Sequence, residues 1–199
     1  MKTKEMTLCA MFAALIAAGA FMRIDIPLPL YTMHFTMQWF FVLLAGFLLG
    51  ARLGMLSVAV YLGVGLVGFP VFAAGGGPAY ILRPGFGFLL GFVGAAGVIG
   101  HFSGTIGRET RLRSLLWPAA MGMLVYYGVG AVYFYLIKNL YAGEQVPFSL
   151  ILVQYCLITV PADLALCVPA AILSRRLQPL LRRELQDGGE RNRTEGRIA

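Results

Sequence analysis

The chain is organised around residues 68–84, which read GFPVFAAGGGPAYILRP and join two strongly apolar segments. This run holds three consecutive glycines and three prolines, so its backbone cannot form one regular helix. Against lipid such a backbone is not tolerated, because each unpaired N–H or C=O group is costly there. The run is therefore either an ordinary external loop or a lid that lines a ligand cavity.

The composition is that of a membrane protein. Of the 199 residues, 59% are hydrophobic and 13% are charged, and the mean hydropathy is +0.77. This length suffices for about six helices of roughly 20 residues each. We predict an all-α integral membrane protein whose single domain covers 1–178, with helices at about 7–22, 35–50, 53–67, 84–102, 115–140 and 148–173. Residues 179–199 are expected to form a basic tail that is disordered beyond 186.

Small residues recur at helical spacing in two of the predicted helices. In the fourth helix they are Gly87, Gly91, Gly94 and Gly97, a spacing that predicts a close helix–helix seam. In the first helix they are Ala10, Ala13, Ala14, Ala17 and Ala18. The alanine stripe either packs within this protein or docks a partner subunit, because small residues let helices approach closely in lipid.

The positive charges predict the orientation. With six spans and both termini in the cytoplasm, all Lys and Arg residues except Arg23, Arg83 and Lys138 fall on the inner side, as the positive-inside rule requires. The net charge of +7 is then mainly an orientation signal. A nucleic-acid partner is not expected, because the sequence has no soluble module with a basic face interleaved with aromatics.

Two ionisable residues away from the cytoplasmic ends are candidates for ligand binding. Asp163 lies between apolar runs, two residues after Pro161, and a buried carboxylate needs a cation or N–H donors. The alternative is a structural ion pair with Arg23 or Arg83. Arg83 precedes a proline at the outer end of a predicted helix, where it could grip a carboxylate or simply reach the lipid headgroups.

Several uncharged residues complete the candidate site. Gln38 can donate and accept hydrogen bonds, and Thr36 lies in the same helical turn. The aromatic side chains of Trp39, Phe72 and Tyr80 could wall an apolar ligand or belong to the interfacial aromatic belt. The glycines of the central run, Gly75, Gly76 and Gly77, could approach a ligand closely.

Metal and catalytic signatures are missing from the sequence. The isolated His34 and His101 and the three cysteines have no metal-ligand spacing, so we predict no metal site and assign the histidines no role. The sequence contains no GxSxG, HExxH or P-loop motif and no cluster of paired carboxylates. Rings of pore-lining polar residues and a convincing internal repeat are lacking too, which disfavours a channel or a self-sufficient transporter. A binding subunit energised by a partner fits better.

The chain resembles the BioY family, the biotin-specific substrate-binding (S) components of energy-coupling factor (ECF) transporters. The resemblance covers essentially 7–177. Its specific part is the series GLVGFPVFA at 65–73, the glycine triplet and PGFGF at 84–88. The stretches FTMQ at 35–38, LAGFLLGARLG at 44–54 and PAD at 161–163 add to it, as do the first-helix alanines.

The resemblance implies an S-component fold of six membrane helices, with the vitamin held near the outer face under the loops between helices 1 and 2 and between helices 3 and 4. Asp163 would take the ureido ring of biotin, with Gln38 and the glycine triplet nearby. The alanine stripe would dock a transmembrane coupling subunit driven by two cytoplasmic ATPases. The chain itself would be no enzyme and would need no cofactor.

Two positions depart from the family pattern. The family commonly has a lysine three residues after the aspartate, as partner of the biotin carboxylate, whereas this chain has Leu166. Gly85 stands where many members have threonine. We expect Arg83, rather than Arg23, to replace the missing lysine, because a guanidinium can hold a carboxylate with two parallel bonds.

High-affinity biotin capture in the cell membrane is the hypothesis that follows. The alternative is another carboxylated ligand on the same scaffold, such as lipoate or a biotin precursor. A structural membrane protein without a ligand and an intramembrane enzyme are the two other classes, and loss of turnover on changing Asp163 would identify the latter.

Overall fold

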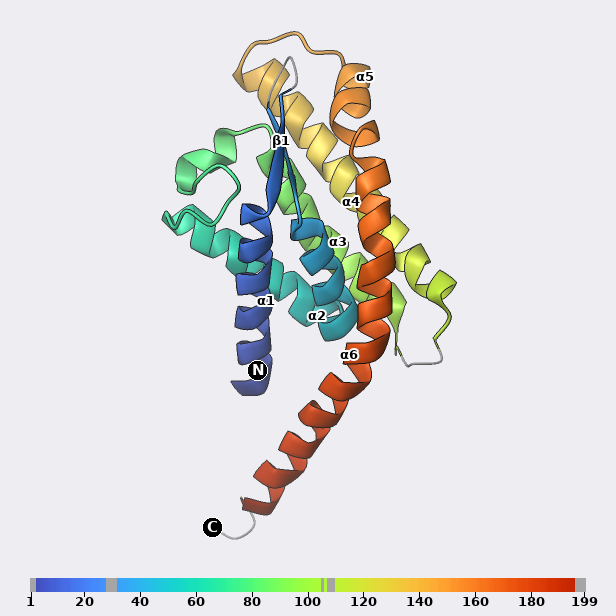
Figure 1. Cartoon of the computed structure of the whole chain (residues 1–199). Coiled ribbons are helices and arrows are strands. Elements are labelled where there is room, and N and C mark those ends of the chain that lie inside the picture. Colours follow the sequence, from blue (N-terminus) through green and yellow to red (C-terminus); the bar gives the residue numbers. More distant parts are fainter. Residues whose placement is uncertain (1–2, 28–31, 105, 107–109, 196–199) are drawn as a thin grey trace.

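The computed structural model describes residues 3–27, 32–104, 106 and 110–195, with side chains described as far as 181. It is almost entirely helical (Figure 1). The described elements are α1 (Thr3–Phe21), β1 (Arg23–Ile26), β2 (Met33–Thr36), α2 (Gln38–Val67), η1 (Pro78–Leu82), α3 (Phe86–Ser103), α4 (Leu112–Leu136), η2 (Ile137–Tyr141), α5 (Phe148–Ile151), η3 (Leu152–Leu157) and α6 (Val160–Glu195).

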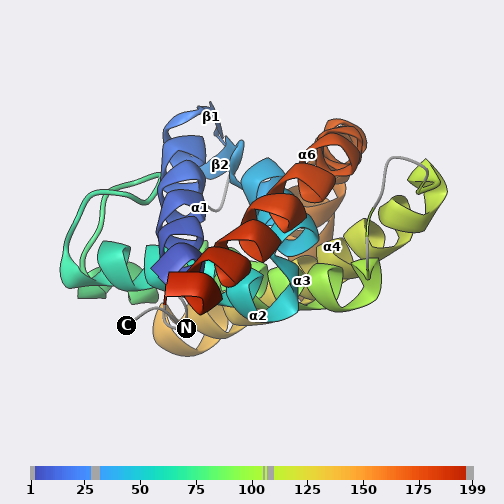
Figure 2. The ribbon, with the colours of Figure 1, turned by 90° about the horizontal axis from the view of Figure 1, so that it is seen from below.

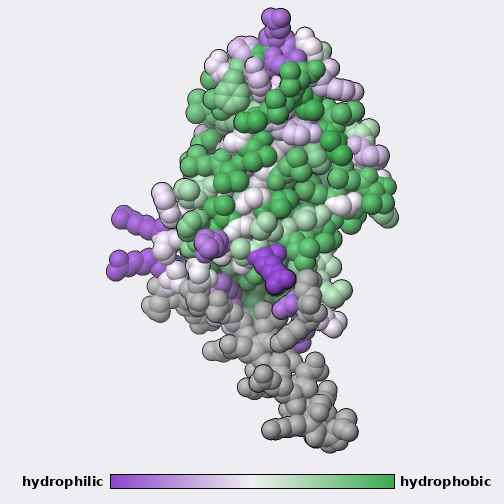
Figure 3. All heavy atoms as spheres, turned by 180° about the vertical axis from the view of Figure 1, so that it is seen from behind, coloured by the Kyte–Doolittle hydropathy of each residue, from purple (hydrophilic) through white to green (hydrophobic). Residues whose placement is uncertain are grey.

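Five helices of the described part are long and apolar enough to cross a membrane: α1, α2, α3, α4 with η2, and α6 as far as Leu181. Figure 3 shows the corresponding surface, a broad hydrophobic belt between hydrophilic side chains at either end. The strands lie at one end of the molecule, the hairpin end, and the first turn of α1 lies toward the other (Figure 1).

The predicted helices 35–50 and 53–67 are the two halves of α2. Gly50 separates them with φ 78° and ψ −179°, a conformation that favours glycine. The second half turns away toward 68–85, on the left in Figures 1 and 2. A Cβ on Gly100 of α3 would lie 2.2 Å from the Ala51 nitrogen, so α3 packs directly against this bend.

The glycine seam predicted in the fourth helix is confirmed. A Cβ on Gly87 would lie 2.2 Å from the Tyr133 Cβ, and one on Gly91 would lie 2.7 Å from the Tyr126 Cα. One on Gly97 would lie 2.7 Å from the Met55 sulfur. Thus α3 packs closely against α4 on one side and α2 on the other, which brings the α4 tyrosines toward the centre.

The local structure differs from the predicted helix bounds in three places. Residues 35 and 36, predicted to begin a helix, belong to strand β2, which pairs antiparallel with β1. Its β-branched and aromatic residues suit a strand. The last predicted helix, which we expected Pro161 and Pro169 to interrupt, is divided into α5, η3 and α6. The break falls at Pro161, which lacks an N–H and lies in the first turn of a new helix, whereas Pro169 lies inside α6.

The third concerns the tail. Helix α6 continues to Glu195, well beyond the expected end near 173 and through most of the segment predicted to be disordered. Residues 174–186 are rich in Leu, Arg and Gln, which are good helix formers, whereas 187–195, DGGERNRTE, include two glycines and have no such local preference. Residues 196–199 lie outside the described part.

Candidate functional site

A cavity lies near the hairpin end and is bounded by β2, the start of α2, η1, α3, α4, η3 and α6. Its wall is mostly aromatic and apolar, with a few polar groups, as is usual for small-molecule sites. The lining residues are Met33, His34, Phe35, Thr36, Gln38, Trp39, Ala73, Tyr80, Gly85, Phe88, Leu89, Phe92, Tyr126, Phe134, Tyr155, Thr159 and Asp163.

Asp163 is the buried carboxylate of this cavity, with 3% of its surface exposed. The hydroxyls of Tyr126 and Tyr127 both donate to its Oδ2, the latter over 2.5 Å. The Tyr127 hydroxyl also lies 2.7 Å from the Thr159 Oγ1. The break before α6 places Thr159 beside the first turn that carries Asp163, so the polar side chains of Asp163, Thr159 and two tyrosines of α4 meet at one point.

Aromatic rings surround this carboxylate. The Trp39 ring lies 4.7 Å from the Tyr126 ring and 6.0 Å from the Phe92 ring, measured between centroids. Phe92 in turn lies 5.1 Å from Tyr126. Trp39 is 1% exposed, and among the described residues its Nε1–H has no oxygen acceptor and faces only the weakly accepting sulfur of Cys167. A buried donor in a cavity wall is suited to a ligand acceptor, because leaving it unpaired is costly.

Gln38 connects the hairpin to the central run. Its Nε2 donates to the Tyr61 hydroxyl over 2.7 Å, and its Oε1 accepts from the Thr36 hydroxyl over 3.2 Å. The Tyr61 hydroxyl donates to the Val71 carbonyl over 3.3 Å. Gln38 is therefore held by protein partners on both its amide atoms, which fixes how the hairpin and residues 68–77 sit beside each other.

The glycine triplet shapes the backbone and does not line the cavity. Gly75 and Gly77 have φ of 112° and 99°, and the Gly77 N–H donates to the Gly65 carbonyl over 2.7 Å. A Cβ on Gly76 would lie 2.1 Å from the Phe69 oxygen. The triplet thus folds the run back onto the end of α2.

That folding fixes the aromatic residues of the run. Phe72 is 1% exposed and packs in the core, with its ring 4.5 Å from the Tyr80 ring. Tyr80 and Ala73 reach the cavity, whereas Phe72 lies behind them. The central run covers the site as a lid would, through Ala73 and Tyr80.

A cluster of ionisable side chains lies on the β1–β2 hairpin, beside the cavity. Asp25 and His34 are cross-strand partners, and the His34 Nδ1 lies 2.6 Å from the Asp25 Oδ1. The Arg23 Nε lies 3.4 Å from the same oxygen. The hydrogen bond with His34, and the charges of His34 and Arg23, lower the pKa of Asp25 from its usual value against a partial loss of solvation.

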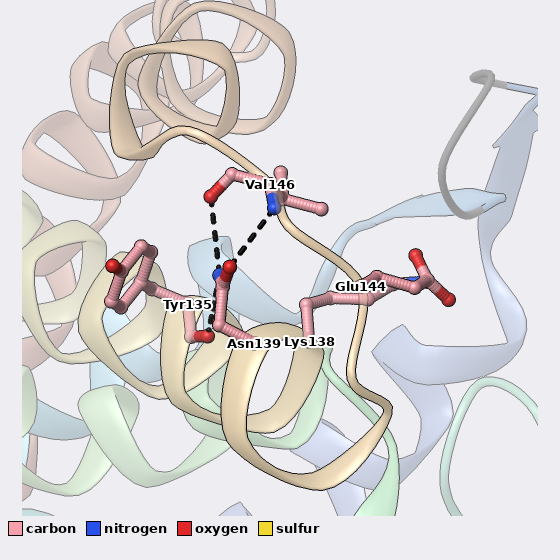
Figure 4. A network of polar contacts seen from close by, with 5 residues as sticks. All are labelled: Tyr135, Lys138, Asn139, Glu144 and Val146. Carbon is pink, nitrogen blue, oxygen red and sulfur yellow. Dashed lines mark hydrogen bonds and ion pairs between the residues drawn. The ribbon is translucent and has the colours of Figure 1, made fainter.

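Two cations near the hairpin end lie outside the cavity lining. Arg83 is exposed, and its guanidinium carbon stacks 4.9 Å from the centre of the Tyr80 ring, on the lid. Lys138 is 8% exposed and pairs with Glu144 at 2.8 Å. Figure 4 shows this pair beside Asn139, which bonds to both backbone groups of Val146 and to the Tyr135 carbonyl.

Of the ten predicted ligand-binding residues, the structure brings five together at the cavity: Thr36, Gln38, Trp39, Tyr80 and Asp163. The other five lie away from its lining: Phe72, Gly75, Gly76, Gly77 and Arg83. The structural ion pair that was the alternative for Asp163, with Arg23 or Arg83, is not formed, since tyrosine hydroxyls are its side-chain partners in the described part. Binding by all ten stays a prediction.

Sequence reasoning missed Tyr126, Tyr127, Thr159 and His34. The adjacent tyrosines in an otherwise apolar helix were a usable signal, because a buried hydroxyl needs a partner and Asp163 was short of donors. His34 carried no such signal. The described residues contain no group of three His, Cys, Asp or Glu side chains that could hold a metal ion.

The alanines of α1 face in two directions. Ala10, Ala14 and Ala18 are exposed, whereas Ala13 is 7% exposed and belongs to the core, with Ala17 half-buried against it. Helix α1 packs on α2 through its other face. A docking surface on this helix would therefore comprise Ala10, Ala14 and Ala18, with Ala13 used inside the protein.

Known proteins resemble this chain over nearly its whole length. A "Probable biotin transporter BioY" of Lysinibacillus sphaericus is 39% identical over 180 residues, covering 90% of this chain and 89% of the relative. The "Biotin transporter BioY" of Thermotoga maritima is 33% identical over 185 residues, covering 89% and 97%.

A solved structure shares the fold. It is the crystal structure of the S-component for biotin from an ECF-type ABC transporter, which matches with a TM-score of 0.76 at 24% identity and covers 90% of this chain and 95% of that one. The family model described as "BioY family" matches residues 1–183. The chain is thus a multi-pass membrane protein with an S-component fold, and it belongs to the BioY family of transporters.

Proposed function

We propose that this protein captures biotin with high affinity and serves as the S component of an ATP-driven ECF transporter. The observation that carries the proposal is Asp163, a buried carboxylate whose two tyrosine donors both bind Oδ2. Its other oxygen, Oδ1, can then accept an N–H of the biotin ureido ring. A carboxylate with this partial set of donors suits a ligand that brings an N–H of its own.

The remaining cavity wall suits the rest of the biotin molecule. Trp39, Phe92 and Tyr126 form a cluster of rings against which an apolar bicyclic ring edge and aliphatic chain can pack. The Trp39 Nε1–H adds a donor for the ureido carbonyl. The polar end of the cavity at Asp163 thus suits the ureido ring of biotin, and the cluster of aromatic rings suits its apolar part.

The proposed partners are a transmembrane coupling subunit and, through it, two cytoplasmic ATPases. The exposed alanines Ala10, Ala14 and Ala18 of α1 support docking, because small side chains allow close helix packing in lipid. In this arrangement both termini are cytoplasmic, ATP is hydrolysed by the partner subunits, and this chain is neither an enzyme nor dependent on a cofactor.

Calorimetric titration of the detergent-purified protein with biotin tests the proposal, with lipoate as the comparison ligand. We expect tight, roughly one-to-one binding of biotin and none of lipoate. Binding of lipoate alone would indicate that Leu166 marks a change of substrate, and a well-folded sample that binds neither would refute the ligand assignment.

A further inference from the structure

A second hollow, the α6 groove, lies along the later part of α6, at the end of the molecule away from the hairpin. Its described lining residues are Ile172, Arg175, Arg176, Leu177 and Leu180, and its volume is about 580 Å³. Small-molecule sites commonly have volumes of about 300–1,000 Å³. The groove is separate from the cavity at Asp163, because Arg176 lies roughly 20 Å further along the same helix at a rise of about 1.5 Å per residue.

The groove lies on the face of α6 that is turned away from the protein. On the packed face, Gln178 is 4% exposed, and its Nε2 donates to the Phe47 carbonyl of α2 over 2.9 Å. Its Oε1 accepts from the Ile106 N–H over 2.5 Å. Residues two positions apart on an α-helix point in nearly opposite directions. Arg176 and Leu180, two positions to either side of Gln178, therefore face outward, and both are exposed.

The groove is at the edge of the apolar belt. The membrane-spanning part of α6 ends at Leu181, so the groove occupies its last turns. Ile172 and Leu180 are 43% and 51% exposed, and in a membrane such side chains are covered by acyl chains. Arg176 is exposed between them along the helix, and Arg175 is half-buried beside it. Apolar and positively charged groups thus share one groove at the depth where acyl chains meet headgroups.

A bend of α6 accounts for the open side of the groove. Pro179 lies inside the helix and has no N–H for the Arg175 carbonyl, and a proline in this position kinks a helix. Figure 1 shows α6 bending near the end of its membrane-spanning part. Beyond the bend the helix leaves the bundle of the other helices, so the groove is not closed by them.

The charge of the groove is positive. Its described lining residues include two arginines and no acidic residue, and Arg176 takes part in none of the ion pairs found in the described part of the chain. A guanidinium binds a phosphate group through parallel N–H donors. Basic pockets beside membrane helices are typical sites for anionic lipid headgroups.

We propose that the α6 groove binds one anionic phospholipid. The phosphate lies at the guanidinium of Arg176, with Arg175 adding positive charge, and an acyl chain lies along Ile172 and Leu180. The exposed apolar side chains favour a lipid over a soluble phosphate, which would gain nothing from them. The positive-inside rule explains arginines at this end of the protein, but it does not require a groove with an apolar wall. The bound lipid would hold the end of α6 at the membrane surface, whatever the cavity binds.

Native mass spectrometry of the full-length protein in detergent tests the proposal. The protein is mixed with equal amounts of dioleoyl phosphatidylglycerol, which is anionic, and dioleoyl phosphatidylcholine, which has the same chains and no net charge. The variants are Arg176→Gln, the double change Arg175→Gln with Arg176→Gln, and the double change of both residues to Lys. The matched control changes two exposed arginines at the start of α4, Arg111→Gln with Arg113→Gln, and so removes the same charge.

We expect the first lipid bound to the wild-type protein to be phosphatidylglycerol in preference to phosphatidylcholine by about tenfold or more, the scale of one charge-assisted hydrogen bond. Arg176→Gln should reduce the preference, and the double Gln variant should abolish it. The double Lys variant should retain part of it, because the charge remains while the parallel donors are lost. The control should behave as the wild type.

Three results would overturn the inference: equal binding of the two lipids by the wild-type protein, a preference that survives in the double Gln variant, or an equal loss of preference in the control. Glycerol 3-phosphate, a headgroup without chains, should not displace phosphatidylglycerol, and displacement would indicate a site for soluble anions instead of a lipid site. Because the readout is a ratio of two lipids in one sample, a partial loss of folded protein does not imitate these results. Arg176→Gln alone changes an exposed side chain, so it provides a folded variant.

Discussion

The ring of Phe72 occupies the space where a side chain on Gly65 would stand. A Cβ on Gly65 would lie 2.1 Å from the Phe72 Cζ, far inside contact distance. The Gly65 carbonyl also accepts the Gly77 N–H. One residue of α2 therefore contacts the lid both at Phe72 and at Gly77. The lid is thus positioned by a close approach of backbone and ring, and Tyr80 and Ala73 reach the cavity as a consequence.

Gly65→Ala should therefore weaken biotin binding and lower thermal stability. The added methyl group must push the Phe72 ring away, and overpacking of this kind costs about 1–3 kcal/mol. Gly63→Ala is the matched control, because it lies one half-turn away on the same helix with no atom within 4 Å of the new Cβ. Melting in detergent and biotin titration provide the readouts, and equal behaviour of the two variants would contradict the proposed packing.

Asp163→Asn should weaken the binding of biotin and of biotinamide, which has an uncharged amide in place of the carboxylate, equally. The amide oxygen of asparagine can still accept from Tyr126 or Tyr127, so the fold is retained, but the charge that strengthens the bond to a ligand N–H is lost. Loss of a charge-assisted bond corresponds to about a tenfold or larger increase in the dissociation constant. Calorimetry with both ligands checks this, and an unchanged affinity would remove Asp163 from the site.

Tyr61→Phe should loosen the lid. The Tyr61 hydroxyl receives the Gln38 amide and donates to the Val71 carbonyl, so its removal leaves both groups without this partner. An unpaired buried polar group costs about 1–3 kcal/mol. Part of this loss should make local opening of the lid backbone more frequent. Hydrogen exchange of the backbone at 68–77 is the measurement. Exchange as slow as in the wild-type protein would show that the Gln38–Tyr61 link does not hold the lid.

Ala14→Phe should block assembly with the coupling subunit and leave biotin binding unchanged. Ala14 is exposed on α1 and away from the cavity lining, so a large side chain there disturbs only a surface that approaches another helix. Leu124→Phe, at an exposed position of α4, is the control for a lipid-facing aromatic. Co-purification with the coupling subunit and ATPases distinguishes the two, and normal assembly of Ala14→Phe would place the docking surface elsewhere.

Hydropathy and local pattern alone were sufficient for the membrane class, the approximate helices and the suspicion about Asp163. A long apolar run is apparent from adjacent residues, and an ionisable residue inside one stands out without knowledge of its neighbours. The glycine seam of α3 is equally local, since its spacing is a property of a single helix. The specific series at 65–88 was enough to suggest the family.

Only the tertiary structure decided what surrounds Asp163 and what covers the cavity. The Tyr126 and Tyr127 hydroxyls come from another helix, and their meeting with Asp163 depends on how α4 and α6 pack. Likewise, the pairing of Asp25 with His34 depends on strand register, so nothing at either position alone predicted it. A binding site is made of contacts between residues far apart in the chain, and those contacts are set by packing rather than by local sequence pattern.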